Sequence, residues 1–306
     1  MANLKELSKK EEKFTGGHRL CSGCGAGIIA RQVLLACDKP VVIANATGCL
    51  EVASTIFPYT SWNVPWFHSA FENAAATVSG IETAYRALKK KGRVTEDINF
   101  IAFGGDGGTY DIGLQSLSGA MERGHNILYV CYNNEAYMNT GIQRSSATPK
   151  GASTTTAPYG KQSTGKVQSR KDLTAIIAAH NVPYVAQTAL GFHNDLISKV
   201  QSALACGGAS FINVLQPCRL GWAYPPEETV RIGKLAVDTC VWPIYEVKNG
   251  EYKLNYKPKE KKPVTEWLKL QGRFKHLFRP GSESVLQQIQ EDVDKNWDKL
   301  LAMCKS

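Results

Sequence analysis

The hydrophobic and polar positions of the chain follow two alternating periods over its first 216 residues. Five stretches carry the three-to-four-residue period of an amphipathic helix, namely residues 25–37, 69–90, 111–123, 171–180 and 193–205. Each is followed by a short apolar run typical of a buried strand, namely residues 41–45, 98–104, 127–132, 182–186 and 211–216. Strands joined by crossovers of helix length form a parallel sheet with helices on both faces. We therefore expect an α/β fold built on a doubly wound, mostly parallel sheet.

The remaining segments have a different character. Residues 140–165 are rich in Ser, Thr and Gly and lack a period, which favours a mobile surface loop or, alternatively, a lid or partner-contacting loop. After Trp222 the stretch 249–263 indicates a polar hairpin and linker, and residues 283–303 have a helical period. We expect an N-terminal segment over 1–40, an α/β domain over 41–222 and a C-terminal extension over 223–306.

Charge and composition narrow the class of protein. The net charge of +9 is spread along the chain without an aromatic-interleaved basic stripe, so we expect no nucleic-acid partner. The polar N-terminus lacks the apolar core of a secretory signal, and no apolar run reaches the roughly 20 residues of a membrane span. We expect a cytoplasmic protein with no membrane contact. Nine cysteines, an odd number, then argue against a disulfide framework and for metal or redox use of a subset.

The unusual residues follow four of the expected strands. Cys49 follows the first, a Gly-Asp-Gly-Gly run the second, an Asn-Asn pair the third, and Cys218 the last. In an open parallel sheet, ligands bind at the carboxyl ends of the strands, where loops and helix N-termini converge. The sequence therefore places its candidate chemistry at one rim of the sheet.

The run Gly105-Asp106-Gly107, followed after 25 intervening residues by Asn133-Asn134, resembles the fingerprint of thiamin-diphosphate enzymes. Glycines let backbone amides approach a diphosphate closely, and the Asp106 carboxylate offers a hard oxygen to Mg²⁺. The side-chain oxygen of Asn134 and a backbone carbonyl near Ala136 would reach the same ion. This spacing favours a cofactor site over a tight turn.

The nine cysteines divide into two groups. Five lie within apolar or helical patterns, where a small buried hydrophobe is the expected role: Cys37, Cys131, Cys206, Cys240 and Cys304. Four lie beside glycine, proline or loops: Cys21, Cys24, Cys49 and Cys218. Four thiolates suit tetrahedral zinc or a [4Fe–4S] cluster, and the first pair alone also suits a redox dithiol. The cysteine pattern by itself leaves these readings open.

Long segments of the chain resemble the β subunit of 2-oxoacid:ferredoxin oxidoreductases, most closely the pyruvate type. The segments are GHRLCSGCGAG, NATGCLEVASTIFPYTSWNVPWFHSAFENAAA, IAFGGDGGTYDIGLQSLSGAMERGHN, NNEAYMNTGIQRSSATP and EWLKLQGRFKHLF. The resemblance implies a sheet of the thiamin-diphosphate-binding type, with an N-terminal cluster-binding segment and a C-terminal extension.

The resemblance also assigns roles to residues. It implies one [4Fe–4S] cluster held by Cys21, Cys24, Cys49 and Cys218. It implies Mg²⁺ ligation by Asp106, Asn134 and the carbonyl of Ala136, and cofactor contacts from Thr47, Gly48, Cys49, Gly105 and Gly107. Asn139, in a Tyr-x-Asn-Thr-Gly turn, would lie near the reactive thiazolium ring.

The activity implied by the resemblance is reversible oxidative decarboxylation of pyruvate with coenzyme A, giving acetyl-CoA, CO₂ and reduced ferredoxin. Thiamin activation needs a glutamate, which the family's α subunit supplies together with substrate residues. We interpret Glu51 and Glu135 as loop residues and Glu72 as helical. Further clusters would come from γ and ferredoxin-like δ subunits or fused equivalents. We therefore expect the chain to be inactive without its partners.

Three alternatives remain at this point. The first is the same family acting on a branched-chain 2-oxoacid or on oxalate, because the substrate-selecting residues are expected largely on the α subunit. The second is a non-redox thiamin decarboxylase or carboligase, although such enzymes usually carry both thiamin-binding halves in one longer chain. The third is a zinc-stabilised binding module in which the Gly-Asp-Gly run is only a turn.

Overall fold

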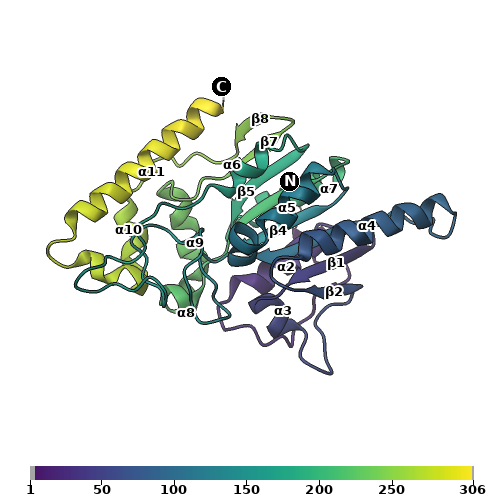
Figure 1. Cartoon of the computed structure of the whole chain (residues 1–306), viewed down its shortest axis with the longest axis horizontal. Helices are drawn as coiled ribbons and strands as arrows, with labels where there is room; N and C mark the ends of the chain where they lie inside the picture. Colours follow the sequence, from purple (N-terminus) through teal and green to yellow (C-terminus); the bar gives the residue numbers. More distant parts are fainter. Residues whose placement is uncertain (1–3, 305–306) are drawn as a thin grey trace.

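An eight-stranded sheet organises the protein, whose computed structural model describes residues 4–304 (Figure 1). The strands are β1 (Val41–Ala46), β2 (Trp66–Ser69), β3 (Asn99–Gly105), β4 (Leu128–Asn133), β5 (Tyr184–Ala189), β6 (Ser210–Leu215), β7 (Tyr245–Lys248) and β8 (Glu251–Leu254). Their order across the sheet is β2-β1-β3-β4-β6-β5-β7-β8. Strands β1 to β6 run parallel, whereas β7 and β8 pair antiparallel beside β5. The expected mostly parallel α/β sheet is confirmed.

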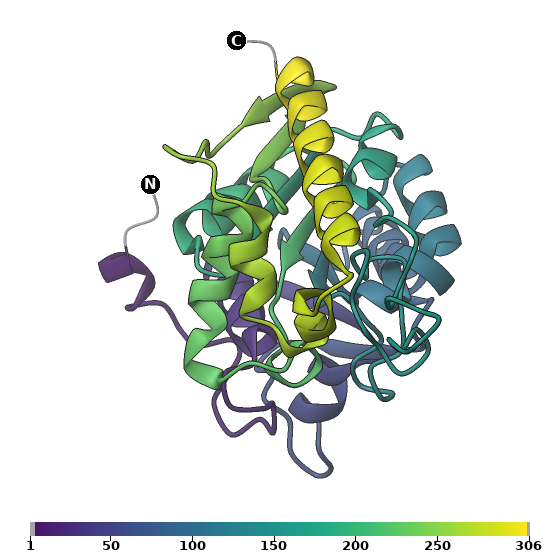
Figure 2. The ribbon, with the colours of Figure 1, turned by 90° about the vertical axis from the view of Figure 1, so that its left-hand side faces the viewer.

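Helices cover both faces of this sheet (Figures 1 and 2). They are α1 (Leu4–Leu7), α2 (Gly25–Leu35), α3 (Cys49–Ser54), α4 (Ala74–Lys90), α5 (Leu114–Glu122), α6 (Leu173–Ala178), α7 (His193–Ala205), α8 (Arg219–Trp222), α9 (Thr229–Asp238), α10 (Val264–Lys269) and α11 (Glu283–Met303), with the short helices η1 (Gly107–Ile112), η2 (Pro226–Glu228) and η3 (Gly272–Phe278). Helices α2 and α7 share one core cluster with Ile43, whereas α4, α5 and α6 share another with Ala44. Adjacent strand residues thus point into opposite cores, which is why the strands read as uninterrupted apolar runs.

The strand order explains where the loops meet. Strands β1, β3, β4 and β6 are neighbours in the sheet although long crossovers separate them in sequence. All four run in the same direction, so their carboxyl ends lie at one rim. The loops after these strands carry Cys49, Asp106, Asn134 and Cys218. The predicted convergence of candidate residues therefore follows from the topology.

Two expected helices begin later than predicted. Residues 69–90 were expected to be helical, but Ser69 ends strand β2 and α4 begins at Ala74. Strand β2 pairs only with β1 at the sheet edge and exposes Phe67 and His68, so it lacks the apolar run of a buried strand. Residues 111–123 form the end of the π-helix η1 and then α5, which begins at Leu114. The amide of Gly113 bonds the Gly108 carbonyl at 2.7 Å, and a Cβ at Gly113 would lie 2.2 Å from that oxygen.

The Ser/Thr/Gly-rich segment 140–165 is not wholly a surface loop. Ser145, Thr148 and Ala152 are buried. Ser145 Oγ donates to the Asp106 carboxylate at 2.6 Å, and the Ser146 amide donates to Asp111 at 2.9 Å. The first half of this segment therefore packs against the loop that follows β3.

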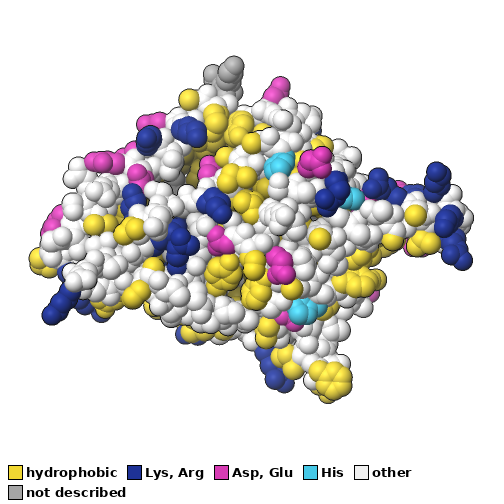
Figure 3. All heavy atoms as spheres, viewed as in Figure 1, with side chains coloured by type: hydrophobic (Ala, Val, Ile, Leu, Met, Phe, Trp, Pro, Cys, Tyr) yellow, Lys and Arg dark blue, Asp and Glu magenta, His cyan; other side chains and the backbone are white. Residues whose placement is uncertain are grey.

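The C-terminal part extends the same sheet. The expected polar hairpin turns at Asn249 and Gly250, whose φ angles of 50° and 84° are those of a tight hairpin turn, and its strands begin earlier, at Tyr245. Helix α11 follows the predicted bounds and lies across the outside of the molecule, over α10 and η3 (Figure 2). Basic side chains on the face in Figure 3 are dispersed, with a group at the end of α4. Within residues 4–304, no helix is long and apolar enough to cross a membrane.

Candidate functional site

A pocket opens where β1, β3 and β4 end. Its lining includes each of the residues that the sequence assigned to the cofactor and to the reactive turn: Thr47, Gly48, Cys49, Gly105, Asp106, Gly107, Asn134, Ala136 and Asn139. These residues come from the ends of three strands and the segments that follow them, and the fold brings them to one place. The aromatic residues Phe71, Tyr132 and Tyr137 complete the wall, and sequence reasoning did not single them out.

Three oxygens meet at the floor of this pocket. Asn134 Oδ1 lies 2.9 Å from Asp106 Oδ1 and 2.9 Å from the carbonyl oxygen of Ala136. If the amide were turned over, its nitrogen would donate to both oxygens, but its oxygen would then face Gln216 Oε1 at 3.2 Å. As it stands, Asn134 Nδ2 donates to that Gln216 oxygen at 3.2 Å. In this orientation Asn134 Oδ1 faces two further acceptor oxygens, and the Asn134 backbone amide donates to one of them, Asp106 Oδ1, at 3.1 Å.

This arrangement fits a hard cation. Mg²⁺ binds oxygens at about 2.0–2.1 Å in an octahedron, so neighbouring ligand oxygens lie about 2.9 Å apart. Asp106 is fully buried, and burial raises the pKa of its carboxyl group to about 7, a cost to the charged form that a cation would offset. No group of three or more His, Cys, Asp or Glu side chains is assembled as a metal site among residues 4–304. The three oxygens of Asp106, Asn134 and Ala136 do not form such a group, because only Asp106 carries an acidic side chain.

The backbone around Glu135 fixes two of these oxygens. Glu135 has a φ of 67°, a left-handed conformation that is uncommon for a residue with a side chain. Its amide donates to Asn133 Oδ1 at 3.0 Å, and its carbonyl accepts from Thr148 Oγ1 at 2.6 Å. Trp222 Nε1 donates to the Asn134 carbonyl at 2.8 Å. This bonding turns Asn134 and Ala136 toward Asp106.

The Glu135 side chain is buried between two arginines. It forms ion pairs with Arg170 and with Arg273, which comes from η3, 138 residues further along the chain. The Arg273 guanidinium also stacks over the Trp222 ring at 3.9 Å. Sequence reasoning placed Glu135 in a loop but gave no sign of its partners. The C-terminal extension thus supports the loop that presents Asn134 and Ala136.

Replacing Arg273 with methionine should lower the free energy of unfolding by about 3–5 kcal/mol, because it leaves a buried carboxylate with only one of its two partners. Urea unfolding of the two proteins measures the difference. Arg279→Met is the matched control, since Arg279 is exposed and forms a cation–π contact with Tyr159 at 5.7 Å. Equal unfolding free energies for Arg273→Met and Arg279→Met would contradict the supporting role of Arg273.

Glycines keep this pocket open. A Cβ at Gly107 would lie 2.4 Å from the Tyr137 ring, and one at Gly48 would lie 2.6 Å from the Tyr132 hydroxyl. That hydroxyl is buried and has no hydrogen-bond partner in the described part of the chain. Thr47 Oγ1 lies 2.7 Å from His68 Nε2 on the edge strand β2. Glycine at both positions therefore lets a tyrosine side chain pack directly against the backbone.

The four selected cysteines line a second cavity of ≈610 Å³ next to the first. Cys49, Asn134 and Asn139 belong to both linings, so the two spaces adjoin. Apolar side chains, among them Val52 and Leu220, form much of the remaining wall. Cys37, Cys131, Cys206, Cys240 and Cys304 line neither cavity.

The thiols in this cavity influence one another. Burial, with a smaller contribution from the nearby cysteines, raises the pKa of Cys24 to about 11 and that of Cys49 to about 12. Cys218 Sγ accepts the Gly221 amide at 3.5 Å, and Cys24 Sγ accepts Gln216 Nε2 at 3.8 Å. Thiols with such raised pKa values stay protonated at pH 7, and a bound cation would be needed to favour their thiolate forms. The four cysteines border one cavity, but they are not assembled as a metal site within residues 4–304.

No glutamate lines either cavity in the described part of the chain. Glu51 lies in α3, so its assignment to a loop is wrong, and His68 Nε2 lies 3.8 Å from its carboxylate. Glu72 lies in the turn before α4, so its assignment to a helix is wrong. The Glu135 carboxylate forms ion pairs with Arg170 and Arg273.

Comparison with known proteins adds independent findings. Residues 46–214 match the family described as thiamine pyrophosphate enzyme, C-terminal TPP binding domain. Pyruvate synthase subunit PorB of Methanocaldococcus jannaschii is 55% identical over 296 residues, covering 96% of this chain and 98% of that protein. Ketoisovalerate oxidoreductase subunit VorB of Pyrococcus abyssi is 42% identical over 292 residues, covering 95% and 93%. The 2-oxoglutarate:ferredoxin oxidoreductase of Magnetococcus marinus shares the fold, with a TM-score of 0.56 and 20% identity over 69% of both chains.

Proposed function

We propose that this chain, which belongs to the family of pyruvate synthase PorB subunits, is the β subunit of a pyruvate-oxidising enzyme. The enzyme would oxidatively decarboxylate pyruvate with coenzyme A to give acetyl-CoA, CO₂ and reduced ferredoxin. The observation that carries the proposal is the junction of two cavities. One has the lining expected for thiamin diphosphate, the other holds four cysteines, and they share Cys49 and Asn139. A decarboxylating centre beside an electron acceptor is what this reaction requires.

The residues of the first pocket would hold the cofactor. Asp106 Oδ1, Asn134 Oδ1 and the Ala136 carbonyl would bind Mg²⁺, as the spacing of their oxygens supports. The backbone at Gly105 and Gly107 would accept the diphosphate. When bound, thiamin diphosphate supplies the electron sink for decarboxylation. Asn139, which borders both cavities, would orient the reacting group by hydrogen bonds.

The residues of the second cavity would hold one [4Fe–4S] cluster. Cys21 and Cys24 come from the segment before α2, Cys49 from the loop after β1, and Cys218 from the loop after β6. The apolar wall would limit the access of water, and burial raises the pKa of Cys218, an effect that the amides of Gly221 and Leu220 partly oppose. Such hydrogen bonds to sulfur tune the potential of iron–sulfur centres. The shared residue Cys49 makes this cluster the first electron acceptor.

The partner subunits would complete the site. An α subunit would supply the activating glutamate and the substrate residues, consistent with the lack of glutamate in the two linings among the described residues. Further clusters would lie on γ and δ subunits or fused equivalents, from which electrons pass to ferredoxin.

The purified chain, loaded with cofactors, should show no pyruvate-dependent dye reduction, because it lacks the glutamate that activates thiamin. Anaerobic assays with and without coenzyme A measure this. The positive control is the complex recovered from native cells by affinity capture of the tagged chain. Turnover by the chain alone would disprove the need for an α subunit. Decarboxylation of pyruvate by the recovered complex without dye reduction would favour a non-redox thiamin decarboxylase instead.

Pyruvate is the proposed substrate because the pyruvate synthase subunits, at 44–55% identity, are more similar to this chain than the ketoisovalerate oxidoreductase subunit, at 42%. A panel of pyruvate, branched-chain 2-oxoacids and oxalate on the recovered complex separates the possibilities. Faster turnover of a branched-chain acid than of pyruvate would assign the chain to that branch of the family.

A further inference from the structure

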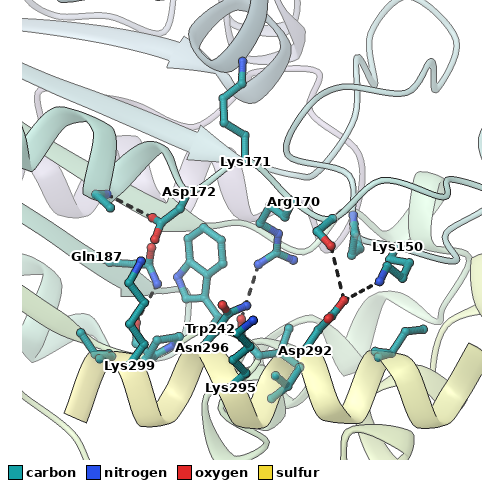
Figure 4. Close-up of a pocket in the computed structure, with 18 of the residues that line it drawn as sticks. Lys150, Arg170, Lys171, Asp172, Gln187, Trp242, Asp292, Lys295, Asn296 and Lys299 are labelled. Carbon is teal, nitrogen blue, oxygen red and sulfur yellow. Dashed lines mark hydrogen bonds and ion pairs between the residues drawn. The ribbon is translucent and has the colours of Figure 1, made fainter. Parts of the chain in front are cut away.

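A third cavity, of ≈350 Å³, lies beneath α11 (Figure 4). Helix α11 forms one side of it, and residues 169–173 and 241–243 form the opposite side. None of its lining residues belongs to the cofactor pocket or to the cysteine cavity. Its volume falls at the lower end of the range of small-molecule sites. The proposed function leaves this space unexplained.

Cationic side chains outnumber acidic ones in the lining of this cavity. Its lining includes five of them and only two acidic ones: Lys150, Arg170, Lys171, Lys295 and Lys299 against Asp172 and Asp292. The acidic groups are already bonded. Asp292 accepts from Lys150 Nζ at 2.5 Å and from Ser169 Oγ at 3.3 Å, and Asp172 caps α6 by accepting the Ala175 amide at 3.1 Å. Arg170 and Lys171 pair with Glu135 and Asp111, which lie outside the lining, so the cations of the lining without an ion-pair partner among the described residues are Lys295 and Lys299.

The free hydrogen-bonding groups are mainly donors. Lys295 and Lys299 have no ion pair or hydrogen bond with any described residue. Four positions apart on α11, they share one face of the helix, and Figure 4 shows both side chains on its cavity side. Trp267, which is 1% exposed, also lines the cavity, and its Nε1–H has no partner in the described part of the chain. Lys295 and Lys299 are exposed, so a negatively charged ligand rich in acceptors would pair with them, and a further acceptor would satisfy Trp267.

The geometry of the donors favours phosphate over carboxylate. Arginine is the usual partner of a carboxylate because its two parallel N–H groups match the two oxygens. Arg170, the only arginine in the lining, already uses its guanidinium on Glu135 and the Ala147 carbonyl. The free cations are lysines, compact point charges that suit the oxygens of a phosphate. We propose that the cavity beneath α11 binds a phosphate-class anion, either free phosphate or a phosphate ester.

This cavity lies behind the loops of the cofactor pocket. Arg170 pairs with Glu135, the residue between Asn134 and Ala136. Lys171, next in the chain, donates to the Tyr110 carbonyl in η1, the helix that follows Asp106. The wall opposite α11 thus contacts the far side of two loops that line the cofactor pocket, the loop after β3 and the loop after β4.

Calorimetric titration of orthophosphate into the full chain at constant ionic strength tests the proposal. Thiamin diphosphate and Mg²⁺ are kept in excess so that orthophosphate cannot occupy the cofactor pocket. Saturable binding is expected, and K295Q/K299Q should weaken it at least about tenfold, because two charge-assisted hydrogen bonds are lost. The control K90Q/K91Q removes the same charge from exposed positions at the end of α4 and should bind like the unmodified chain.

A competition experiment distinguishes free phosphate from a phosphate ester as the ligand. Competition by glycerol 3-phosphate would support the site as one for phosphate esters, and failure to compete would support it as one for free phosphate. Equal affinities of the two double variants, or no saturable binding of either probe, would overturn the proposal. Circular dichroism and melting temperature should be unchanged in K295Q/K299Q, since neither lysine has a partner to lose.

Discussion

Replacing Asp106 with asparagine is expected to weaken thiamin diphosphate binding in the presence of Mg²⁺ at least about 100-fold, more than the loss of a residue that only supports a metal ligand. Asp106 contributes the one formal negative charge among the three clustered oxygens. Asparagine preserves the shape of the side chain but removes that charge, so the remaining oxygens must hold the cation alone. Titration calorimetry with the cofactor at saturating Mg²⁺ measures the effect.

The control for this variant is Asp97→Asn, the same substitution at an exposed position where the carboxylate pairs with Lys39 and Lys89. Its cofactor affinity should match that of the unmodified chain. The fold of Asp106→Asn should survive, because burial already disfavours the charged carboxylate and raises the pKa of Asp106. An Asp106→Asn chain that binds the cofactor as tightly as the Asp97→Asn chain would refute the magnesium site.

Replacing Cys49 or Cys218 with serine should remove the visible absorption of the chain and its bound iron, because a cubane cluster is held by four thiolates. The matched control is Cys206→Ser: Cys206 lies outside the cavity, and its thiol bonds the Ala203 carbonyl at 3.0 Å. That variant should keep both iron and colour. Anaerobic purification followed by iron, sulfide and zinc analysis provides the measurement.

The same analysis decides between the alternatives for the cysteine set. Stoichiometric zinc without iron would identify a structural zinc site and remove the electron acceptor from the proposed function. Metal-free protein with a reactive pair at Cys21 and Cys24 would identify a dithiol. Cys218→Ser should still bind thiamin diphosphate, because Cys218 lines only the cysteine cavity, whereas Cys49 lines both. This difference separates loss of the cluster from collapse of the whole site.

Much of the fold could be predicted because each buried strand appears in the sequence as a short, continuous apolar run. The helices over 193–205 and 283–303 were predicted with the bounds that the structure shows. Strand β2 could not be predicted, because four residues that are half exposed at an edge leave no period to read. In the π-helix, the Gly108 carbonyl approaches Gly113 so closely that a side chain there would clash. This contact leaves no mark in the hydrophobic pattern of the sequence.

The residues at the site were predictable for a related reason. Loops that follow adjacent parallel strands must meet, so Asp106 and Asn134 could be placed together from the spacing of their strands. Their supports were not predictable in the same way. Ser145 bonds Asp106 from a segment without a period, and Arg273 reaches Glu135 across 138 residues. Such contacts exist only once the chain is folded, and a single sequence carries no mark of them.

The two edge strands of the sheet have a consequence for how the chain meets its neighbours. Both β2 and β8 are four residues long, β8 alternates exposed Glu251 and Lys253 with half-buried residues, and Pro65 directly precedes β2. Short edges that carry charge or begin at proline resist the addition of another strand. These edges therefore disfavour self-association of the chain by β-strand addition. Contacts with other subunits are accordingly expected through loops and helices rather than through strand addition.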